Sequence, residues 1–146
     1  MLAVEKLLFW RGKNPVLDGI SFDLPGAGIV PLMGYNGAGK TTLLKILSGN
    51  LIPDSGSISW DSQPWFKSWE VPVQIGYLPE NFAPPQCLTS RQYLGFTRQF
   101  NQASVEQSTF LIQELGLEEQ LDRPIGKLSK GFCQRLGLAQ AFMGNK

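Results

Sequence analysis

One segment, Gly34–Thr41, constrains this chain more than any other. It reads Gly-Tyr-Asn-Gly-Ala-Gly-Lys-Thr, which matches the pattern GxxxxGK followed by Ser or Thr. The apolar run before it, Ile29–Met33, predicts a strand buried on both faces, although Pro31 cannot donate to a sheet ladder. The residues after it, Thr41–Gly49, carry leucine and isoleucine at helical spacing. A glycine loop between a strand and a helix is the setting in which this pattern binds phosphate.

The loop has the residue types that phosphate binding requires. Its glycines allow backbone N–H groups to turn inward, and the start of the following helix adds partial positive charge. Lys40 supplies a full charge for the β- and γ-phosphates of a nucleotide. The hydroxyl of Thr41 suits Mg²⁺ that bridges the same phosphates. Alone, the motif leaves ATPases, GTPases and kinases open.

The composition of the chain excludes several kinds of function. At 146 residues the chain has about the length of one domain, and 42% hydrophobic with 17% charged residues indicates a globular protein. The net charge of +1 gives no basic footprint for nucleic acid. The sequence has no histidine, which excludes histidine bases and histidine metal ligands. Cys87 and Cys133 lie far apart and are expected to be free thiols in the cytoplasm.

Two kinds of secondary structure follow one another. Further strands are expected at Val16–Leu24, Ser57–Trp60 and Val73–Leu78. From Leu88 the period becomes helical, and Thr89–Gln92 and Ser104–Gln107 fit the capping box that opens a helix. The second of these helices ends near Gly116, and a last helix runs from about Gly131 to Phe142. The sequence therefore predicts an α/β part over residues 1–80 and a helical part over residues 81–146.

Several ordered motifs together resemble one family. Asn36–Lys45, Leu47-Ser-Gly and Pro53–Gly56 look like the start of an ABC-type ATPase. Leu128–Arg135 resembles the ABC signature, LSGGQ followed by Gln-Arg, at a transporter-like distance from Lys40. Between them, Ile75–Glu80 resembles the segment that enters the Q-loop. The resemblance extends over nearly the whole chain.

The resemblance implies a fold and a site. The fold would be an α/β P-loop NTPase of the ABC type, with an antiparallel β subdomain and a helical signature subdomain. Two ATP molecules would lie between the P-loop of one domain and the signature of a second, head-to-tail ABC ATPase domain, with Mg²⁺ held by Thr41 and Glu80. The implied nucleotide-binding residues are Trp10, Gly34, Asn36, Gly37, Ala38, Gly39, Lys40, Thr41, Thr42, Glu80, Leu128, Ser129, Lys130 and Gly131.

Some roles remain open at this stage. Trp10, or next Phe9, is the aromatic residue expected to stack on adenine, and both could equally be core residues. Glu80 stands at the Q-loop glutamine position and could instead be a surface charge. Lys130 departs from the usual signature but favours phosphate, whereas Phe132 would remove a polar group beside the nucleotide. Leu128–Arg135 could also be only a helix start with core leucines.

The resemblance also implies partners and an incomplete catalytic apparatus. The expected partners are the second ATPase domain and a transmembrane permease, not nucleic acid, and the expected location is cytoplasmic, peripheral on the inner face of the cell membrane. The family's Walker B Asp and Glu and its switch histidine would follow residue 146, so the chain is expected to be truncated before the Walker B strand and not hydrolytic alone. The region Cys87–Leu94 looks like that of ABC-2-type exporters. The alternatives are a non-hydrolytic nucleotide-binding or dimer-interaction module, and a DNA-repair or translation ABC ATPase.

Overall fold

The computed structural model describes residues 1–64 and 75–144. The chain divides into two compact units, residues 1–72 and 73–146. The sequence places the change to helical structure at residue 80, and the loop at 75–80 belongs to the second unit.

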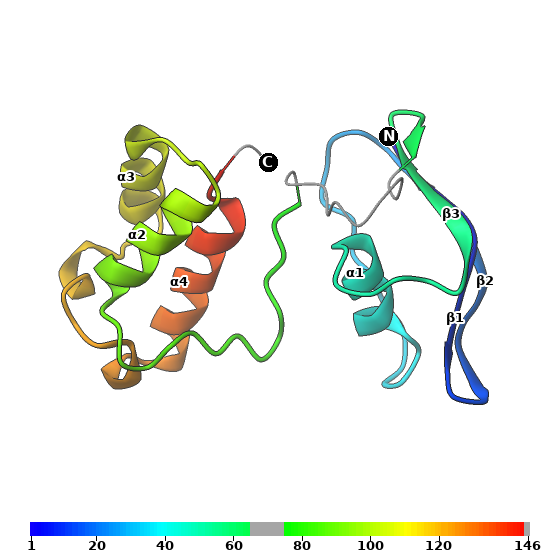
Figure 1. Ribbon diagram of the computed structural model, residues 1–146, viewed down its shortest axis with the longest axis horizontal. Coiled ribbons are helices and arrows are strands. Elements are labelled where there is room, and N and C mark those ends of the chain that lie inside the picture. The colour runs from blue at the N-terminus through cyan, green and yellow to red at the C-terminus, as the bar shows by residue number, and fades with distance from the viewer. Residues whose placement is uncertain (65–74, 145–146) are drawn as a thin grey trace. The chain divides into compact units, whose positions relative to one another are not determined.

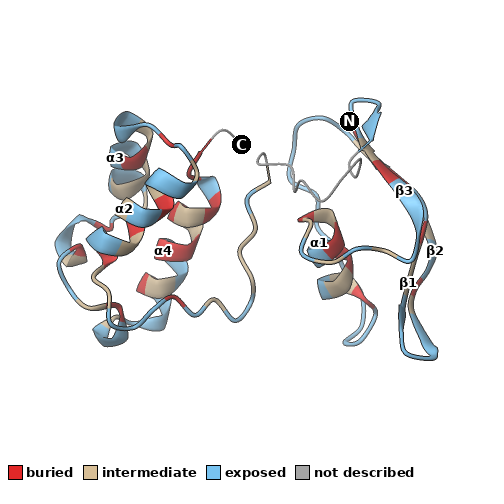
Figure 2. Cartoon of the chain, in the orientation of Figure 1, coloured by how far each residue is buried: buried red, intermediate tan, exposed pale blue. Residues whose placement is uncertain are grey.

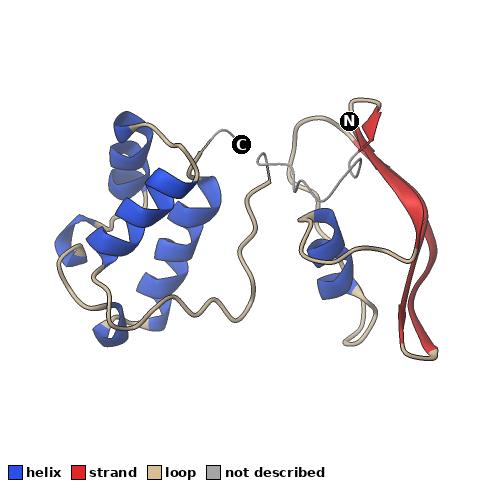
Figure 3. Cartoon of the chain, in the orientation of Figure 1, coloured by secondary structure: helices blue, strands red, loops and turns tan. Residues whose placement is uncertain are grey.

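The first unit is built on an antiparallel sheet with the strand order β2-β1-β3-β4 (Figures 1 and 3). Its strands are β1 (Leu2–Arg11), β2 (Asn14–Leu24), β3 (Ser55–Trp60) and β4 (Gln63–Pro64). The central strand β1 pairs on both sides, and its buried Val4 lies opposite Phe22 of β2 and Ile58 of β3. The helix α1 (Lys40–Leu47) lies in the same unit and contacts β2.

The strand predicted at Val16–Leu24 is confirmed and begins two residues earlier. Its half-buried Ile20, Phe22 and Leu24 alternate with exposed neighbours, as the period of two requires. The β1–β2 register shifts between the pairs Leu7↔Ile20 and Phe9↔Leu17, which marks a bulge. Pro15 lies in an edge strand, where its missing N–H is tolerated.

The strand predicted at Ile29–Met33 is wrong for the structure described. These residues form no strand, and the side chains of Ile29 and Met33 are 99% and 85% exposed. A strand requires a hydrogen-bonded neighbour, and no strand within 1–64 or 75–144 pairs with this run. The apolar composition of this run suits a buried strand, but the described residues offer it no neighbouring strand with which to pair.

The second unit is a bundle of helices. They are α2 (Ser90–Phe100), α3 (Val105–Glu114), α4 (Lys130–Phe142) and two short 3₁₀ turns, η1 (Glu118–Gln120) and η2 (Ile125–Lys127). Figure 2 shows the buried residues on the inner faces of these helices. The core consists of Leu94, Ala103, Leu117, Leu121, Ile125, Phe132, Leu136, Ala139 and Met143. No helix of the described residues is long and apolar enough to cross a membrane.

The helix starts follow the predicted capping chemistry in one case and depart from it in another. Thr89 and Gln92 form the complete capping box of α2. Ser104 caps α3 by accepting from the N–H of Gln107, but the Gln107 side chain does not return to Ser104. It binds the end of α4 instead, donating to the carbonyls of Phe142 and Gly144 and accepting from the N–H of Gly144.

The strand predicted at Val73–Leu78 is not seen. Val73 and Gln74 lie outside the described residues, and the rest of the segment, Ile75–Leu78, has no regular secondary structure. It runs close to α4, since a Cβ added to Gly137 would lie 2.5 Å from Leu78 Cδ1. The apolar residues of this segment thus pack on a helix rather than in a sheet.

Candidate nucleotide-binding site

The glycine loop meets α1 at a residue that only glycine fits well. Gly39 is the N-cap of α1 and has φ 86° and ψ 2°, in the left-handed region. It is buried, and an added Cβ would lie 2.7 Å from the carbonyl oxygen of Val16 and 2.8 Å from Leu17 Cδ2. Close backbone contact with β2 therefore fixes where the loop ends and the helix begins.

The loop is folded around the lysine of the motif. The ammonium group of Lys40 donates to the carbonyl oxygens of Gly34 at 2.7 Å and Tyr35 at 2.8 Å. The N–H of Ala38 donates to the same Tyr35 oxygen at 3.2 Å, which closes the turn. These bonds hold the positive charge at the loop, where phosphate oxygens can replace the carbonyls as acceptors.

The remaining loop and helix residues supply donors. The first hydrogen bond within α1 runs from the N–H of Leu43 to the carbonyl of Gly39, so the preceding N–H groups have no helical partner. Thr41 is exposed and Thr42 is half-buried at this end of α1. Gly34, Asn36, Gly37 and Ala38 are all exposed. The arrangement is open to solvent and suited to an anion.

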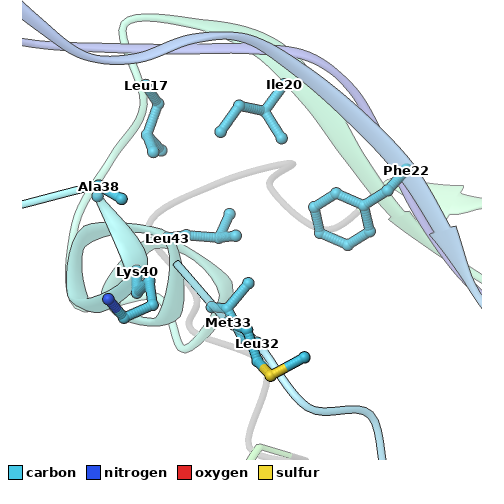
Figure 4. Close-up of a pocket in the computed structure, with 9 residues that line it drawn as sticks. Leu17, Ile20, Phe22, Leu32, Met33, Ala38, Lys40 and Leu43 are labelled. Atoms are coloured by element: carbon cyan, nitrogen blue, oxygen red, sulfur yellow. The ribbon is translucent and has the colours of Figure 1, made fainter. Parts of the chain in front are cut away.

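A separate apolar cavity lies between the loop, α1 and β2. It has a volume of about 220 Å³ and is lined by Leu17, Ile20, Phe22, Leu32, Met33, Ala38, Gly39, Lys40 and Leu43. Figure 4 shows Leu17, Ile20 and Phe22 pointing from the sheet toward Leu43, with the Lys40 nitrogen turned away from them. Its lining suits hydrocarbon and not phosphate, so the cavity is the interior behind the loop rather than the phosphate site.

Trp10 lies near the part of β2 that contacts the loop. It pairs with Pro15 of β2. The next residue, Val16, is the one whose carbonyl lies close to Gly39. Its side chain is 45% exposed, whereas Phe9 is half-buried and pairs with Leu17. Of the two aromatic residues, Trp10 is the more available to a ligand.

The signature residues form the start of α4 in the second unit. Ser129 is the N-cap, and its Oγ accepts from the N–H of Phe132 at 3.2 Å. Ser129, Lys130 and Gly131 are exposed, and an added Cβ at Gly131 would meet nothing within 4 Å. Leu128 is half-buried against the core of this unit. An exposed helix start with a free surface before it is the setting that phosphate recognition needs.

The expectation that Phe132 changes the polarity beside a nucleotide is wrong, because this side chain points into the core. Phe132 is 2% exposed and packs in the helical bundle. The Arg135 guanidinium lies 4.9 Å from the centre of its ring and donates to the carbonyls of Leu115 and Gly116 at 2.9 and 3.0 Å. Arg135 thus joins α4 to the end of α3, a role that the signature motif does not indicate.

The predicted site residues thus fall into two groups, one in each unit. Trp10 and the loop through Thr42 belong to the first unit, whereas Glu80 and Leu128–Gly131 belong to the second. Glu80 is an exposed turn residue. The described residues contain no cluster of three or more acidic, cysteine or histidine side chains that could hold a metal alone. Mg²⁺ would therefore be held at the loop by few protein ligands, together with phosphate and water.

Comparison with known proteins decides the family. The family model for the ABC transporter matches residues 17–146, which include both the loop and the signature. The chain belongs to the ABC transporter family. A solved structure described as the ATP binding subunit of an ABC transporter has a TM-score of 0.84 and 28% identity, covering 97% of this chain and 61% of that one. The fold is therefore the α/β P-loop fold of ABC ATPases, as the motifs predicted.

Curated members of the ABC transporter family are similar over almost the whole chain. The cytochrome c biogenesis ATP-binding export protein CcmA of Cupriavidus pinatubonensis is 32% identical, over 96% of this chain and 63% of that protein. The zinc import ATP-binding protein ZnuC of Psychrobacter cryohalolentis is 31% identical, over 98% of this chain and 56% of that protein. The chain thus spans less than two thirds of the length of these two relatives.

Proposed function

We propose that this chain provides the ATP-binding part of an ABC transporter ATPase. The observation that carries the proposal is the loop around Lys40, seated on β2 by Gly39 at the start of α1. Membership of the ABC transporter family and the relatives' names as ATP-binding proteins support ATP as the nucleotide.

Different residues are proposed to bind the phosphates, the metal ion and the base. Lys40 would exchange the carbonyls of Gly34 and Tyr35 for the β- and γ-phosphate oxygens, and the loop N–H groups would complete the cradle. Thr41 is the proposed protein ligand of Mg²⁺ at the loop, where the ion would neutralise charge on the phosphates. A role of Glu80 in holding the ion stays a prediction. Trp10 is the proposed stacking partner of adenine, because it is exposed next to the β2 residues that seat the loop.

The start of α4 is the proposed half-site for a second nucleotide. Ser129 and Gly131 would contact the γ-phosphate held by a second ABC ATPase domain, and Lys130 would add charge. The exposure of these residues and the open space before Gly131 support this role. The proposed partners are this second domain and a membrane permease, with the chain on the cytoplasmic face of the membrane.

Nucleotide titration tests the proposal. In the presence of Mg²⁺, calorimetry of the purified protein is expected to show ATP binding at least tenfold tighter than AMP binding, because the phosphate contacts lie at the loop. Replacing Thr41 by Val should reduce the benefit of Mg²⁺ and leave binding without the ion nearly unchanged. Equal affinities for ATP and AMP would refute the proposed use of the loop.

A further inference from the structure

Asp54, the residue before β3, holds the backbone of Trp10 from the β3 side of β1. The Trp10 N–H donates to the Asp54 carboxylate, Oδ2, at 2.6 Å. The Asp54 N–H in turn donates to the carbonyl of Leu8 at 2.9 Å. One acidic residue thus makes both a donor and an acceptor contact with the same stretch of β1, two residues apart.

The sheet explains why a side chain is needed there. β3 begins at Ser55, which pairs with Leu8, so β1 extends beyond β3 and Trp10 has no β3 residue opposite it. The carboxylate of Asp54 takes the place of the carbonyl that a longer β3 would offer. A charged acceptor makes a stronger hydrogen bond than a neutral one, so the free edge of β1 is held firmly at Trp10.

We propose that Asp54 is a positioning residue for adenine recognition, acting through the backbone of Trp10. This inference rests on the proposed function, in which Trp10 stacks on the base. Stacking requires the exposed Trp10 ring to start from a fixed point, and the hydrogen bond to Asp54 fixes the strand backbone from which that ring projects. Asp54 supplies that restraint without touching the nucleotide.

Asp61 offers a matched control at the other end of β3. It follows β3 at the opposite end and accepts from the N-terminal ammonium group of Met1. It is exposed, and its positive φ of 47° is one that asparagine accommodates. The variants Asp54→Asn and Asp61→Asn therefore make the same chemical change at the two ends of β3, only one of which faces Trp10.

The experiment measures ATP and inorganic tripolyphosphate binding, both with Mg²⁺, by calorimetry. Tripolyphosphate has the phosphate chain of ATP but no adenine, so its affinity measures binding to the loop alone. Trp10→Ala is expected to weaken ATP binding about five- to tenfold, the range of a lost aromatic–base stack, and to leave tripolyphosphate binding within about twofold. Asp54→Ala should weaken ATP binding about threefold to fivefold with the same selectivity. Adding it to Trp10→Ala should cause no further loss.

Each outcome decides the inference. Asp54→Asn keeps an acceptor oxygen and should show a smaller loss of ATP binding, which also serves if Asp54→Ala does not fold by circular dichroism. Asp61→Asn should bind both ligands as the wild type does. The inference is overturned if Asp54 variants bind ATP normally, lose tripolyphosphate binding equally, or add to Trp10→Ala. If the wild type binds ATP no more tightly than tripolyphosphate, the inference about Asp54 is overturned, but the proposed phosphate binding by the loop stands. If the wild type binds neither ligand, the proposed function itself is refuted.

Discussion

Gly39 lies against the backbone of Val16, and a Cβ at this glycine would come within 2.7 Å of the Val16 carbonyl oxygen. The contact joins the end of the glycine loop to β2, beside the apolar cavity that lies between the loop, α1 and β2. The position of the loop therefore depends on a residue with no side chain.

Replacing Gly39 by Ala should destabilise the protein by about 2 kcal/mol or more, since it combines left-handed strain with a collision against fixed backbone. Urea unfolding measures the loss. Gly37→Ala is the matched control: Gly37 also has a positive φ, 85°, but an added Cβ meets nothing within 4 Å, so only the conformational cost of about 1 kcal/mol applies. Equal losses in the two variants would show that the Val16 contact does not constrain the loop.

Gly131→Ala should leave folding intact while impairing assembly. The added methyl group has free space, and alanine is a better helix former than glycine, so the melting temperature should stay the same or rise slightly. In the proposed function, however, this surface faces a nucleotide held by a second domain. ATP-dependent association, followed by light scattering, should weaken several-fold. Normal association of the Gly131→Ala variant would contradict the proposed role of the α4 start.

Arg135→Ala should lower the stability of the helical unit by about 1 kcal/mol, because two hydrogen bonds to the end of α3 and the contact with the Phe132 ring are lost. Arg135→Lys should recover only part of this, since an ammonium group cannot reproduce the guanidinium geometry. Lys127→Ala, an exposed residue of η2, controls for loss of positive charge. A loss no greater than that of the control would mean that Arg135 does not join the two helices.

The ion pair between Arg91 and Asp122 should make stability weakly dependent on pH. Hydrogen bonding to the Arg91 guanidinium lowers the pKa of the Asp122 carboxyl below its ordinary value of 3.8. Because the folded-state pKa is the lower one, the stabilisation is present above the ordinary pKa and disappears as the pH falls through the lowered value. Asp122→Asn should flatten the acid limb of the stability profile slightly; a profile identical to that of the wild type would show that the pair contributes nothing.

Local chemistry allowed several elements to be predicted from the sequence. The strand ending at Leu24, the capping box at Thr89 and the start of α4 near Gly131 all depend on residues close together in the chain. Predictions that depended on distant neighbours were less successful. Ile29–Met33 has the composition of a buried strand, but its pairing depends on other strands.

The candidate site shows the same division. The loop residues and the exposed Ser129–Gly131 follow from the motifs, since glycine, lysine and hydroxyl residues at this spacing serve phosphate directly. The inward position of Phe132 and the hydrogen bond from Trp10 to Asp54 could not be read from spacing. Both depend on which side of a helix or strand faces its neighbours in the fold.

The affinity of Lys40→Ala for ATP in the presence of Mg²⁺ tests the central claim most directly. Lys45→Ala is the matched control, because Lys45 is an exposed lysine in the last turn of the same helix. We expect calorimetry to show a loss of at least tenfold for Lys40→Ala, from the missing charge at the β- and γ-phosphates, and no change for Lys45→Ala. Equal ATP affinities for the wild type and Lys40→Ala would show that the loop does not hold the nucleotide.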